Sequence, residues 1–207
     1  MFVLFTGIVQ AVLPVKAVSS EDGLCRFTFE FPDALAAGLE IGASVSVNGV
    51  CLTVTHISQN DVNFEAVSET MRVSNLKTVE RNSMVNIERS AKRDDEVSGH
   101  VVSGHVMGTA KVSSVESTPN NCRMTFGMPK DWFRFVFNKG FIAINGASLT
   151  VAGLDKEAGT LTVNLIPETL RSSNFRLLGV SDEVNIEIDS QTQAIVETVE
   201  RVLSERN

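Results

Sequence analysis

The sequence predicts an all-β protein, in which two similar small barrels or sandwiches follow one another and a helix ends the chain. An eight-residue phrase occurs twice, as VNGVCLTV at 47–54 and as INGASLTV at 144–151. Alternating polar and apolar runs recur at intervals of about ten residues with turn residues between them, which is typical of barrels and sandwiches rather than of βαβ units. The final segment, 190–207, instead carries apolar residues at helical spacing.

The repetition extends well beyond the eight-residue phrase. Its matched landmarks are Asn48-Gly49 with Asn145-Gly146, Leu52-Thr53 with Leu149-Thr150, SETMRVSN (68–75) with PETLRSSN (167–174), MVNIER (84–89) with EVNIEI (183–188), and Thr6-Gly7-Ile8-Val9 with Ser103-Gly104-His105-Val106. The offset is 97 or 99 positions throughout, and the order of the landmarks is the same in both halves. Chance similarity does not keep order and spacing together, so we infer a duplicated domain.

Each half contains its own strands. An Asn-Gly pair stands between two alternating runs at 44–57 and again at 141–154, which is the strongest short signal for a β-hairpin. Further strands are expected at 25–31, 61–67 and 160–166, and brief helical turns at 32–38, around 68–75 and around 167–174. The charged segment AKRDDEVSG (91–99) ends in Ser-Gly and marks a boundary. The expected units are an N-terminal domain at 1–99, a C-terminal domain at 100–189 and a helix at 190–207.

The C-terminal helix has an apolar stripe made of Ile195, Val196, Val199, Val202 and Leu203, preceded by polar residues that suit an N-cap. This stripe has no partner inside either repeat. Two interpretations remain open: the stripe packs back on its own barrel, or it packs on copies of itself and builds an oligomer.

The composition is that of an ordinary globular protein, with 43% hydrophobic and 21% charged residues. A formal charge of −7 argues against a nucleic-acid partner, which requires a basic surface. No apolar run approaches the roughly 18–20 residues of a membrane span, and the N-terminus lacks the basic region and cleavage site of a signal peptide. Three cysteines at unrelated spacings predict neither disulfides nor a metal site, and a cytoplasmic location is expected.

The repeated phrase places small polar residues on one face of a strand. Because side chains alternate, Val50, Leu52 and Val54 share one face, and Cys51 and Thr53 share the other. The corresponding faces in the second half are Ala147, Leu149 and Val151, and Ser148 and Thr150. Short uncharged polar groups suit a surface covered by a ligand or a neighbouring domain, whereas the simpler interpretation is that Thr and Ser are good strand formers.

Other residues in these segments have both a structural and a functional interpretation. His100 and His105 are five positions apart, on opposite faces of a strand, so a metal pair is not expected. A lone His105 is usually structural, although imidazole is the side chain best suited to move protons near neutral pH. Cys51 is equally compatible with an inert core thiol, and the aromatic cluster DWFRFVF (131–137) with a core or an interface.

Taken together, the phrases FTGIVQ, VNGVCLTV, SETMRVSN, VNIER, SGHVMGTA, KGFIAINGASLTV, IPETLRSSN and VNIEID resemble the riboflavin synthase family. The likeness runs from Phe5 to the C-terminal helix, and the doubled lumazine-binding half is specific to this family and its close relatives. The resemblance implies an all-β fold of two similar six-stranded Greek-key barrels in tandem, plus a C-terminal α-helix that holds a homotrimer together.

The resemblance also implies a reaction. Two molecules of 6,7-dimethyl-8-ribityllumazine give riboflavin and 5-amino-6-ribitylamino-2,4-pyrimidinedione when a four-carbon unit passes from one lumazine to the other, without a metal or an organic cofactor. A dismutation needs two copies of one substrate, which would explain a duplicated domain. In the family the N-terminal barrel of one subunit faces the C-terminal barrel of its neighbour. Whether the trimer also associates with lumazine synthase stays open.

Site residues follow from matching the family's motifs position by position. For the N-terminal barrel the resemblance implies substrate contacts from Gly7, Ile8, Val9, Val50, Cys51, Leu52, Thr53, Glu65, Ala66, Val67, Ser68, Glu69, Thr70, Gly104, His105 and Val106. For the C-terminal barrel it implies Lys139, Ser148, Leu149, Thr150, Ile166, Pro167, Glu168, Thr169, Leu170 and Arg171. The catalytic candidates are Cys51, His105, Ser148 and Thr150, with Phe5 near the reacting rings. Which of them is the base and which the nucleophile stays open.

The chain departs from the family pattern in two places. Three extra residues lengthen the usual opening, so that Phe2 competes with Phe5 for its place, and Asn145 stands where many members have an Asp near the C-terminal site. The nearest rival function is a lumazine or flavin antenna protein, which shares the doubled fold without turning its ligand over. Antenna proteins tend to lose polar site residues in one half, whereas both halves keep them here. A barrel module without a small-molecule site is a more distant alternative.

Overall fold

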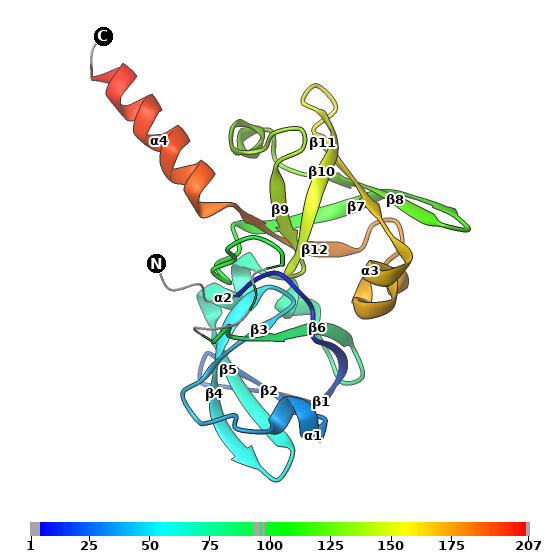
Figure 1. The fold of residues 1–207 in the computed structure, drawn as a ribbon. Helices are drawn as coiled ribbons and strands as arrows, with labels where there is room; N and C mark the ends of the chain where they lie inside the picture. The colour runs from blue at the N-terminus through cyan, green and yellow to red at the C-terminus, as the bar shows by residue number, and fades with distance from the viewer. Residues whose placement is uncertain (1–4, 93–95, 97, 206–207) are drawn as a thin grey trace.

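The computed structural model describes residues 5–92, 96 and 98–205, and it confirms the predicted fold of two closed six-stranded barrels in tandem with a C-terminal helix (Figure 1). The N-barrel consists of β1 (Ala11–Glu21), β2 (Leu24–Glu30), β3 (Ser44–Val47), β4 (Val50–Ser58), β5 (Asp61–Val67) and β6 (Met84–Arg89). The C-barrel consists of β7 (Gly108–Thr118), β8 (Asn121–Gly127), β9 (Phe141–Ile144), β10 (Ala147–Asp155), β11 (Thr160–Leu165) and β12 (Glu183–Ile188). The helices are α1 (Asp33–Ala36), α2 (Ser68–Val73), α3 (Pro167–Ser172) and α4 (Ser190–Ser204), and the 3-10 turns are η1 (Asn75–Thr78), η2 (Lys130–Phe135) and η3 (Asn174–Leu177).

Both barrels have the same antiparallel Greek-key strand order. Around the N-barrel the order is β1-β2-β5-β4-β3-β6, and around the C-barrel it is β7-β8-β11-β10-β9-β12. The two predicted Asn-Gly hairpins form between β3 and β4 and between β9 and β10. The predicted helical turns are also present, as α1, α2 and α3. Duplication in the sequence is therefore duplication of a complete barrel.

The alternation of the sequence decides which side chains fill each barrel. Val50, Leu52 and Val54 on β4 are at most 4% exposed, while Cys51 is half-buried and Thr53 is exposed. The same pattern recurs on β10, where the buried side chains are Ala147, Leu149 and Val151, Ser148 is half-buried and Thr150 is exposed. The short polar residues of the repeated phrase therefore lie on the outer faces of the barrels.

Six buried asparagines join the two barrels. They are Asn48, Asn75 and Asn86 from the first repeat and their equivalents Asn145, Asn174 and Asn185 from the second. The side-chain amide of Asn86 donates to the Asn145 carbonyl at 2.9 Å, and that of Asn185 donates to the Asn48 carbonyl at 2.8 Å. These contacts are reciprocal, so the junction relates the barrels by an approximate twofold axis.

Asn145 lies in this junction, and the expectation that it stands near the C-barrel site is wrong. Its Oδ1 accepts from the backbone N–H of Asn185 at 2.8 Å and from the Nδ2 of Asn75 at 3.1 Å. Its position follows from the tip of the β9–β10 hairpin, which points at the other barrel. An amide at this position supplies a buried acceptor without burying a charge.

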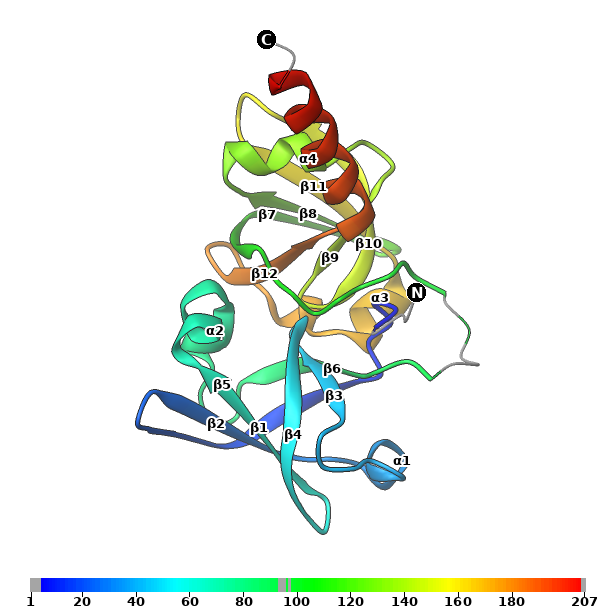
Figure 2. The same ribbon diagram turned by 90° about the vertical axis from the view of Figure 1, so that its left-hand side faces the viewer.

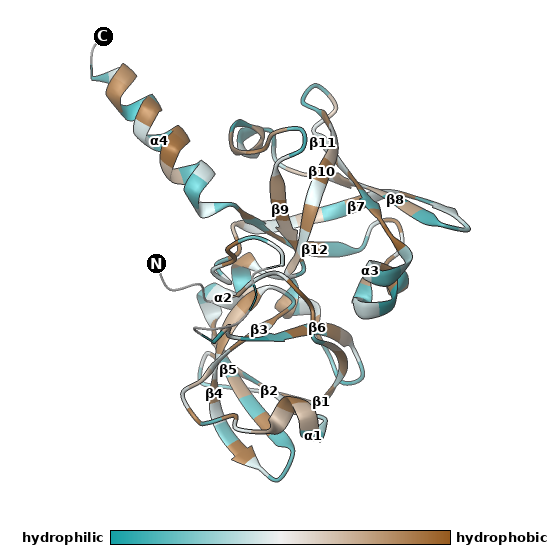
Figure 3. Ribbon diagram, in the orientation of Figure 1, coloured by the Kyte–Doolittle hydropathy of each residue, from teal (hydrophilic) through white to brown (hydrophobic). Residues whose placement is uncertain are grey.

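The C-terminal helix α4 projects from the end of the C-barrel in Figure 1. Asp189 caps its N-terminus by accepting from the Thr192 N–H at 2.9 Å. Val196 packs on the C-barrel core, and an Arg134–Glu200 ion pair of 2.9 Å ties the helix to η2. The other residues of the stripe, Ile195, Val199, Val202 and Leu203, are exposed, and the helix shows brown bands between teal ones in Figure 3. Packing on its own barrel thus accounts for only one residue of the stripe.

Some expectations are outside what the structure describes. Phe2 lies outside the described residues, as do residues 93–95 and 97 within the expected boundary segment. The aromatic cluster at 131–137 places Phe133 and Phe135 in the core and leaves Phe137 half exposed. Among the described residues, no helix combines the length and the apolar character needed to cross a bilayer.

Candidate functional site

The N-barrel site is centred on the outer face of β4. The backbone N–H of Cys51 donates to the carbonyl of Gly104 at 2.8 Å, so that residues 103–106 lie along this strand. The side chain of His105 is exposed, as is that of Thr53 two residues beyond Cys51. The structure thus brings together Cys51, Thr53 and His105, three of the predicted site residues.

The C-barrel site repeats this arrangement on β10. The backbone N–H of Ser148 donates to the carbonyl of Gly7 at 2.8 Å, so that residues 6–9 lie along the strand. Ile8 is exposed at the position that His105 occupies in the other site, and Thr150 is exposed beyond Ser148. The two sites therefore have the same backbone arrangement but differ in their side chains.

The loop in each site belongs to the opposite repeat. Residues 6–9 precede the N-barrel in sequence but lie on the C-barrel, where Val9 packs against the core; Val106 likewise packs against the N-barrel core. The grouping of Gly7, Ile8 and Val9 with the N-barrel is therefore wrong. The two loops cross because Phe5 and Val102 form a short antiparallel bridge, with N–H to O distances of 2.9 and 3.0 Å.

Both loops approach their strands so closely that only glycine fits. Gly7 and Gly104 have φ angles of +75° and +80°, in the left-handed region. A Cβ on Gly7 would lie 2.6 Å from the Cβ of Ser148, and one on Gly104 would lie 2.5 Å from the Cβ of Cys51. These two glycines thus set how near the loop comes to each polar strand residue.

His100, which the sequence brought into question only as a metal ligand, is a residue of the C-barrel site. Its Nδ1 lies 2.6 Å from the Ser148 hydroxyl, and its ring stacks on Phe141 at 5.3 Å with an interplanar angle of 13°. Phe141 is opposite Thr150 in the β9–β10 ladder. Burial lowers the pKa of His100, and the charge of Asp189 acts in the opposite direction. The sequence carries no signal for this contact, because it joins residues 48 positions apart.

Cys51 has different surroundings in the N-barrel site. Burial raises the pKa of its thiol, a hydrogen bond with Ser44 lowers it, and the negative charge of Glu187 raises it further. Ser44 occupies the position that Phe141 has in the second repeat, and it is opposite Thr53 in the β3–β4 ladder. The pKa of the Cys51 thiol therefore lies above its ordinary value.

Phe5 lies behind the N-barrel site and is fully buried. It forms a small cluster with Val102, Ala143 and the half-buried Cys51. A Cβ on Gly104 would lie 2.9 Å from its ring, so Phe5 supports the loop that carries His105. In the single chain the ring of Phe5 is therefore not accessible to a ligand. It affects the site only through the loop that it supports.

The remaining predicted residues divide by burial. The side chains of Val50, Leu52, Ala66 and Leu149 point into the barrels, so only their backbones are available to a ligand. Val67 and Ile166 occupy equivalent positions of the two repeats and are 53% and 60% exposed. Lys139 is exposed, and the exposed helical residues include Ser68, Glu69, Pro167, Glu168 and Arg171, while Thr70, Thr169 and Leu170 are half-buried.

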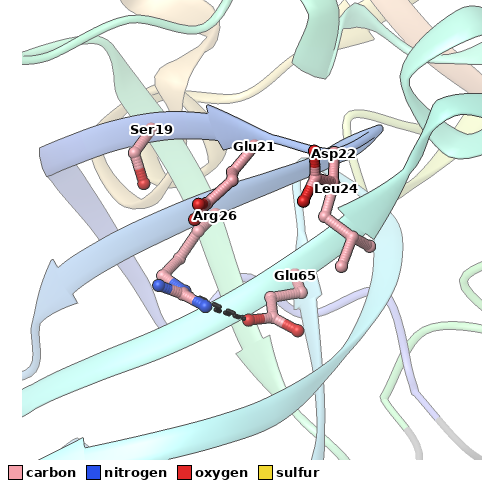
Figure 4. A pocket seen from close by; sticks show the side chains of 6 residues that line it. All are labelled: Ser19, Glu21, Asp22, Leu24, Arg26 and Glu65. Atoms are coloured by element: carbon pink, nitrogen blue, oxygen red, sulfur yellow. Dashed lines mark hydrogen bonds and ion pairs between the residues drawn. The ribbon is translucent and has the colours of Figure 1, made fainter.

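Two of the predicted acidic site residues, Glu65 and Glu168, are held in ion pairs. Arg26 contacts Glu65 at 2.7 Å on the wall of a surface pocket formed by the β1–β2 hairpin and β5 (Figure 4). Glu168 and Arg171 form an ion pair of 2.7 Å within α3. The central groups of both sites are hydroxyls, a thiol, imidazoles and backbone amides, which suit a polar ligand.

Comparison with known proteins identifies the repeated unit. The family model described as the lumazine binding domain matches residues 6–90 and again 103–189. The riboflavin synthase of Escherichia coli (strain K12) is 43% identical over 204 residues, which cover 98% of this chain and 95% of that protein. The riboflavin synthase of Chlamydia pneumoniae is 34% identical, with coverage of 97% and 98%.

Solved structures share the fold at lower identity. The crystal structure of LumP complexed with riboflavin superposes with a TM-score of 0.84 at 24% identity, covering 90% of this chain and 100% of that one. The complex of LumP with 6,7-dimethyl-8-(1'-D-ribityl) lumazine gives a TM-score of 0.80 at the same identity. This likeness shows that the doubled barrel is shared.

Proposed function

The chain belongs to the riboflavin synthase family, and from that premise we propose that it converts two molecules of 6,7-dimethyl-8-ribityllumazine into riboflavin and 5-amino-6-ribitylamino-2,4-pyrimidinedione. It is an enzyme of riboflavin biosynthesis, a transferase that moves a four-carbon unit between two identical substrates. The observation that carries this proposal is the pair of equivalent outer-face sites, one on β4 and one on β10. Each offers a backbone loop, a small polar residue and a threonine to one lumazine.

The two sites of one chain do not face each other, which supports a reaction chamber shared between subunits. In Figures 1 and 2, α2 beside the N-barrel site and α3 beside the C-barrel site lie on opposite sides of the junction. Two ring systems that exchange carbon atoms must lie face to face. The N-barrel of one subunit therefore meets the C-barrel of another, and Val67 and Ile166 supply apolar surface at that contact.

A homotrimer is the assembly we propose for this contact. The exposed apolar residues of α4 supply a further surface for other copies of the chain. Holding both substrates in the reacting orientation contributes about 7–11 kcal/mol of the barrier in favourable cases. We also propose that the trimer associates with lumazine synthase. The three free cysteines are consistent with the cytoplasmic location that we propose.

The chemistry requires a base that removes a proton from the C7 methyl group of one lumazine. It also requires a nucleophile, from water or a side chain, that adds to the other lumazine. His105 is exposed beside Cys51 in one site, and Ser148 is hydrogen-bonded to His100 in the other. These groups, with Thr150, are the proposed participants, and Phe5 acts from behind Cys51.

A direct assay tests the function. The purified protein is incubated with 6,7-dimethyl-8-ribityllumazine, and riboflavin formation is followed by its visible absorbance. Catalytic formation of riboflavin is the expected result. Tight binding without turnover would instead support the antenna function, for which the LumP likeness provides the fold alone. If the protein neither binds nor converts the lumazine, only the function of a barrel module remains.

A further inference from the structure

We infer that Glu88 and Glu187 are positioning residues that act crosswise, each holding the loop that completes the site of the opposite barrel. Glu88 is on β6 of the N-barrel and Glu187 is on β12 of the C-barrel, at equivalent positions of the two repeats. They are 3% and 4% exposed. This inference rests on the proposed function for its catalytic meaning, although the contacts themselves stand without it.

Glu88 binds the loop that lies on the C-barrel. One of its carboxylate oxygens accepts from the Thr6 backbone N–H at 2.7 Å and from the Thr6 hydroxyl at 2.8 Å. The other oxygen accepts from the Gly7 N–H at 3.1 Å. The carbonyl of Gly7 in turn accepts from Ser148. The loop is therefore held at one side by a carboxylate of the N-barrel and at the other side by the site strand of the C-barrel.

Glu187 repeats these contacts with the barrels exchanged. One oxygen accepts from the Ser103 N–H at 2.6 Å and from the Ser103 hydroxyl at 2.7 Å, and the other accepts from the Gly104 N–H at 2.9 Å. The carbonyl of Gly104 accepts from Cys51 on β4. A carboxylate of the C-barrel thus fixes the loop that presents His105 to the N-barrel site.

Burial raises the pKa of both glutamates, and the N–H and hydroxyl donors around them act in the opposite direction by favouring the ionised carboxylates. Both oxygens face N–H groups, and neither carboxylate has a Lys or Arg ion-pair partner among the described residues. Such charge-assisted hydrogen bonds are the strong ones. Glutamine has the same shape, but its NH2 group would meet the N–H of Gly7 or Gly104. A buried donor facing a donor leaves both unsatisfied, so the loop would shift away from its strand.

Hydrogen exchange tests the crosswise pattern without relying on catalysis. In Glu88→Gln the amides of residues 6–8 should exchange at least about tenfold faster, and those of residues 103–105 should be unchanged; Phe5 and Val102 are left out of the comparison because their amides are hydrogen-bonded to each other. In Glu187→Gln the amides of residues 103–105 should exchange faster, and those of residues 6–8 should be unchanged. Glu116→Gln is the control, because Glu116 is exposed on β7. Acceleration of both loops in both variants, or of neither, would overturn the inference.

Riboflavin binding tests the functional consequence. The wild type should show ligand protection at β4 with α2 and at β10 with α3. Glu187→Gln should lose protection at β4 and α2, and Glu88→Gln should lose it at β10 and α3. Loss in the barrel that carries the substituted residue would refute the crosswise arrangement. A wild type that forms no riboflavin would refute the proposed function, while the exchange rates of the loops would still decide the inference.

Milder variants keep the test decisive if the Gln variants do not fold. Thr6→Val and Ser103→Ala each remove one hydroxyl donor and keep the carboxylate charge. Thermal unfolding establishes that they are folded. Thr6→Val should accelerate exchange several-fold only at residues 6–8 and weaken riboflavin binding only at the C-barrel site. Ser103→Ala should do the same only at residues 103–105 and at the N-barrel site. Equal exchange rates in variant and wild type would contradict the inference.

Discussion

The Nδ1 of His100 lies 2.6 Å from the hydroxyl of Ser148, which makes the C-barrel site chemically different from the N-barrel site. The N-barrel site instead has a half-buried thiol, Cys51, beside an exposed imidazole, His105. A dismutation gives its two identical substrates different roles. We propose that two sites with the same backbone arrangement and different proton-transfer groups meet that requirement.

Burial of His100 predicts a loss of stability on acidification. Because the folded state lowers its pKa below the ordinary value of 6.5, the unfolded state binds this proton more tightly. The contribution of neutral His100 is therefore fully present above about pH 6.5 and declines as the pH falls below it. Thermal unfolding between about pH 7 and pH 5.5 should show a smaller decrease of Tm in His100→Gln than in the wild type.

The matched control for this pH dependence is Asn138→Gln, because Asn138 is exposed and carries no titratable group. That variant should keep the wild-type dependence of Tm on pH. Asp189 opposes the effect at His100, so the difference between His100→Gln and the wild type is a net one. Parallel curves for the wild type and His100→Gln would contradict the prediction.

Substitutions at the N-barrel site should affect turnover more than binding. His105→Gln and Cys51→Ala, made separately, should lower kcat by about 10- to 100-fold, because each removes a group able to transfer protons. Lumazine affinity should change less, since backbone amides of the loop and strand remain. Steady-state kinetics and fluorescence titration measure the two quantities. His56→Gln, exposed farther along β4, is the control; unchanged turnover in both site variants would remove these residues from the mechanism.

The asparagine junction should be a large contributor to stability. The side chain of Asn185 donates to the Asn48 carbonyl and to Asn75 Oδ1 and accepts from the Asn75 N–H. Asn185→Ala leaves these buried groups without partners and should lower the free energy of unfolding by about 2–4 kcal/mol. Urea denaturation measures this free energy of unfolding. Asn164→Ala, at an exposed position of β11, should change it by less than about 0.5 kcal/mol; equal effects would speak against the network.

The exposed stripe of α4 should control assembly. Ile195→Glu and Val199→Glu place charges where apolar surface would be covered in a trimer, so sedimentation should show a shift toward smaller species. Ala194→Glu, on the opposite side of the helix, should leave the assembly unchanged. Because the proposed chamber is shared between subunits, turnover should fall with the trimer population. A monomeric variant with full activity would contradict the shared chamber.

Much of the fold was predictable because it depends on local patterns. The matched phrases identify the duplication, and the Asn-Gly pairs identify the β3–β4 and β9–β10 hairpins. Alternation placed Leu52 inside the barrel and Cys51 and Thr53 outside, since the two faces of a strand are set by a period of two residues. The apolar spacing of the tail likewise identifies α4.

The sites depend on contacts that no local pattern encodes. Packing between segments far apart in the chain decides which barrel receives residues 6–9, which carboxylate holds them, and which hydroxyl His100 meets; the separations are 82 positions for Thr6 and Glu88 and 48 positions for His100 and Ser148. Asn145 shows the limit most clearly, because its place in the repeated phrase suggests the C-barrel site while its side chain takes part in the junction between the barrels. The sequence by itself determined two equal barrels with polar outer strands, since side-chain alternation and turn chemistry act over a few residues. Only the tertiary structure decided that the two loops cross, because the Phe5–Val102 bridge and the buried Glu88 and Glu187 form only once both barrels are folded against each other.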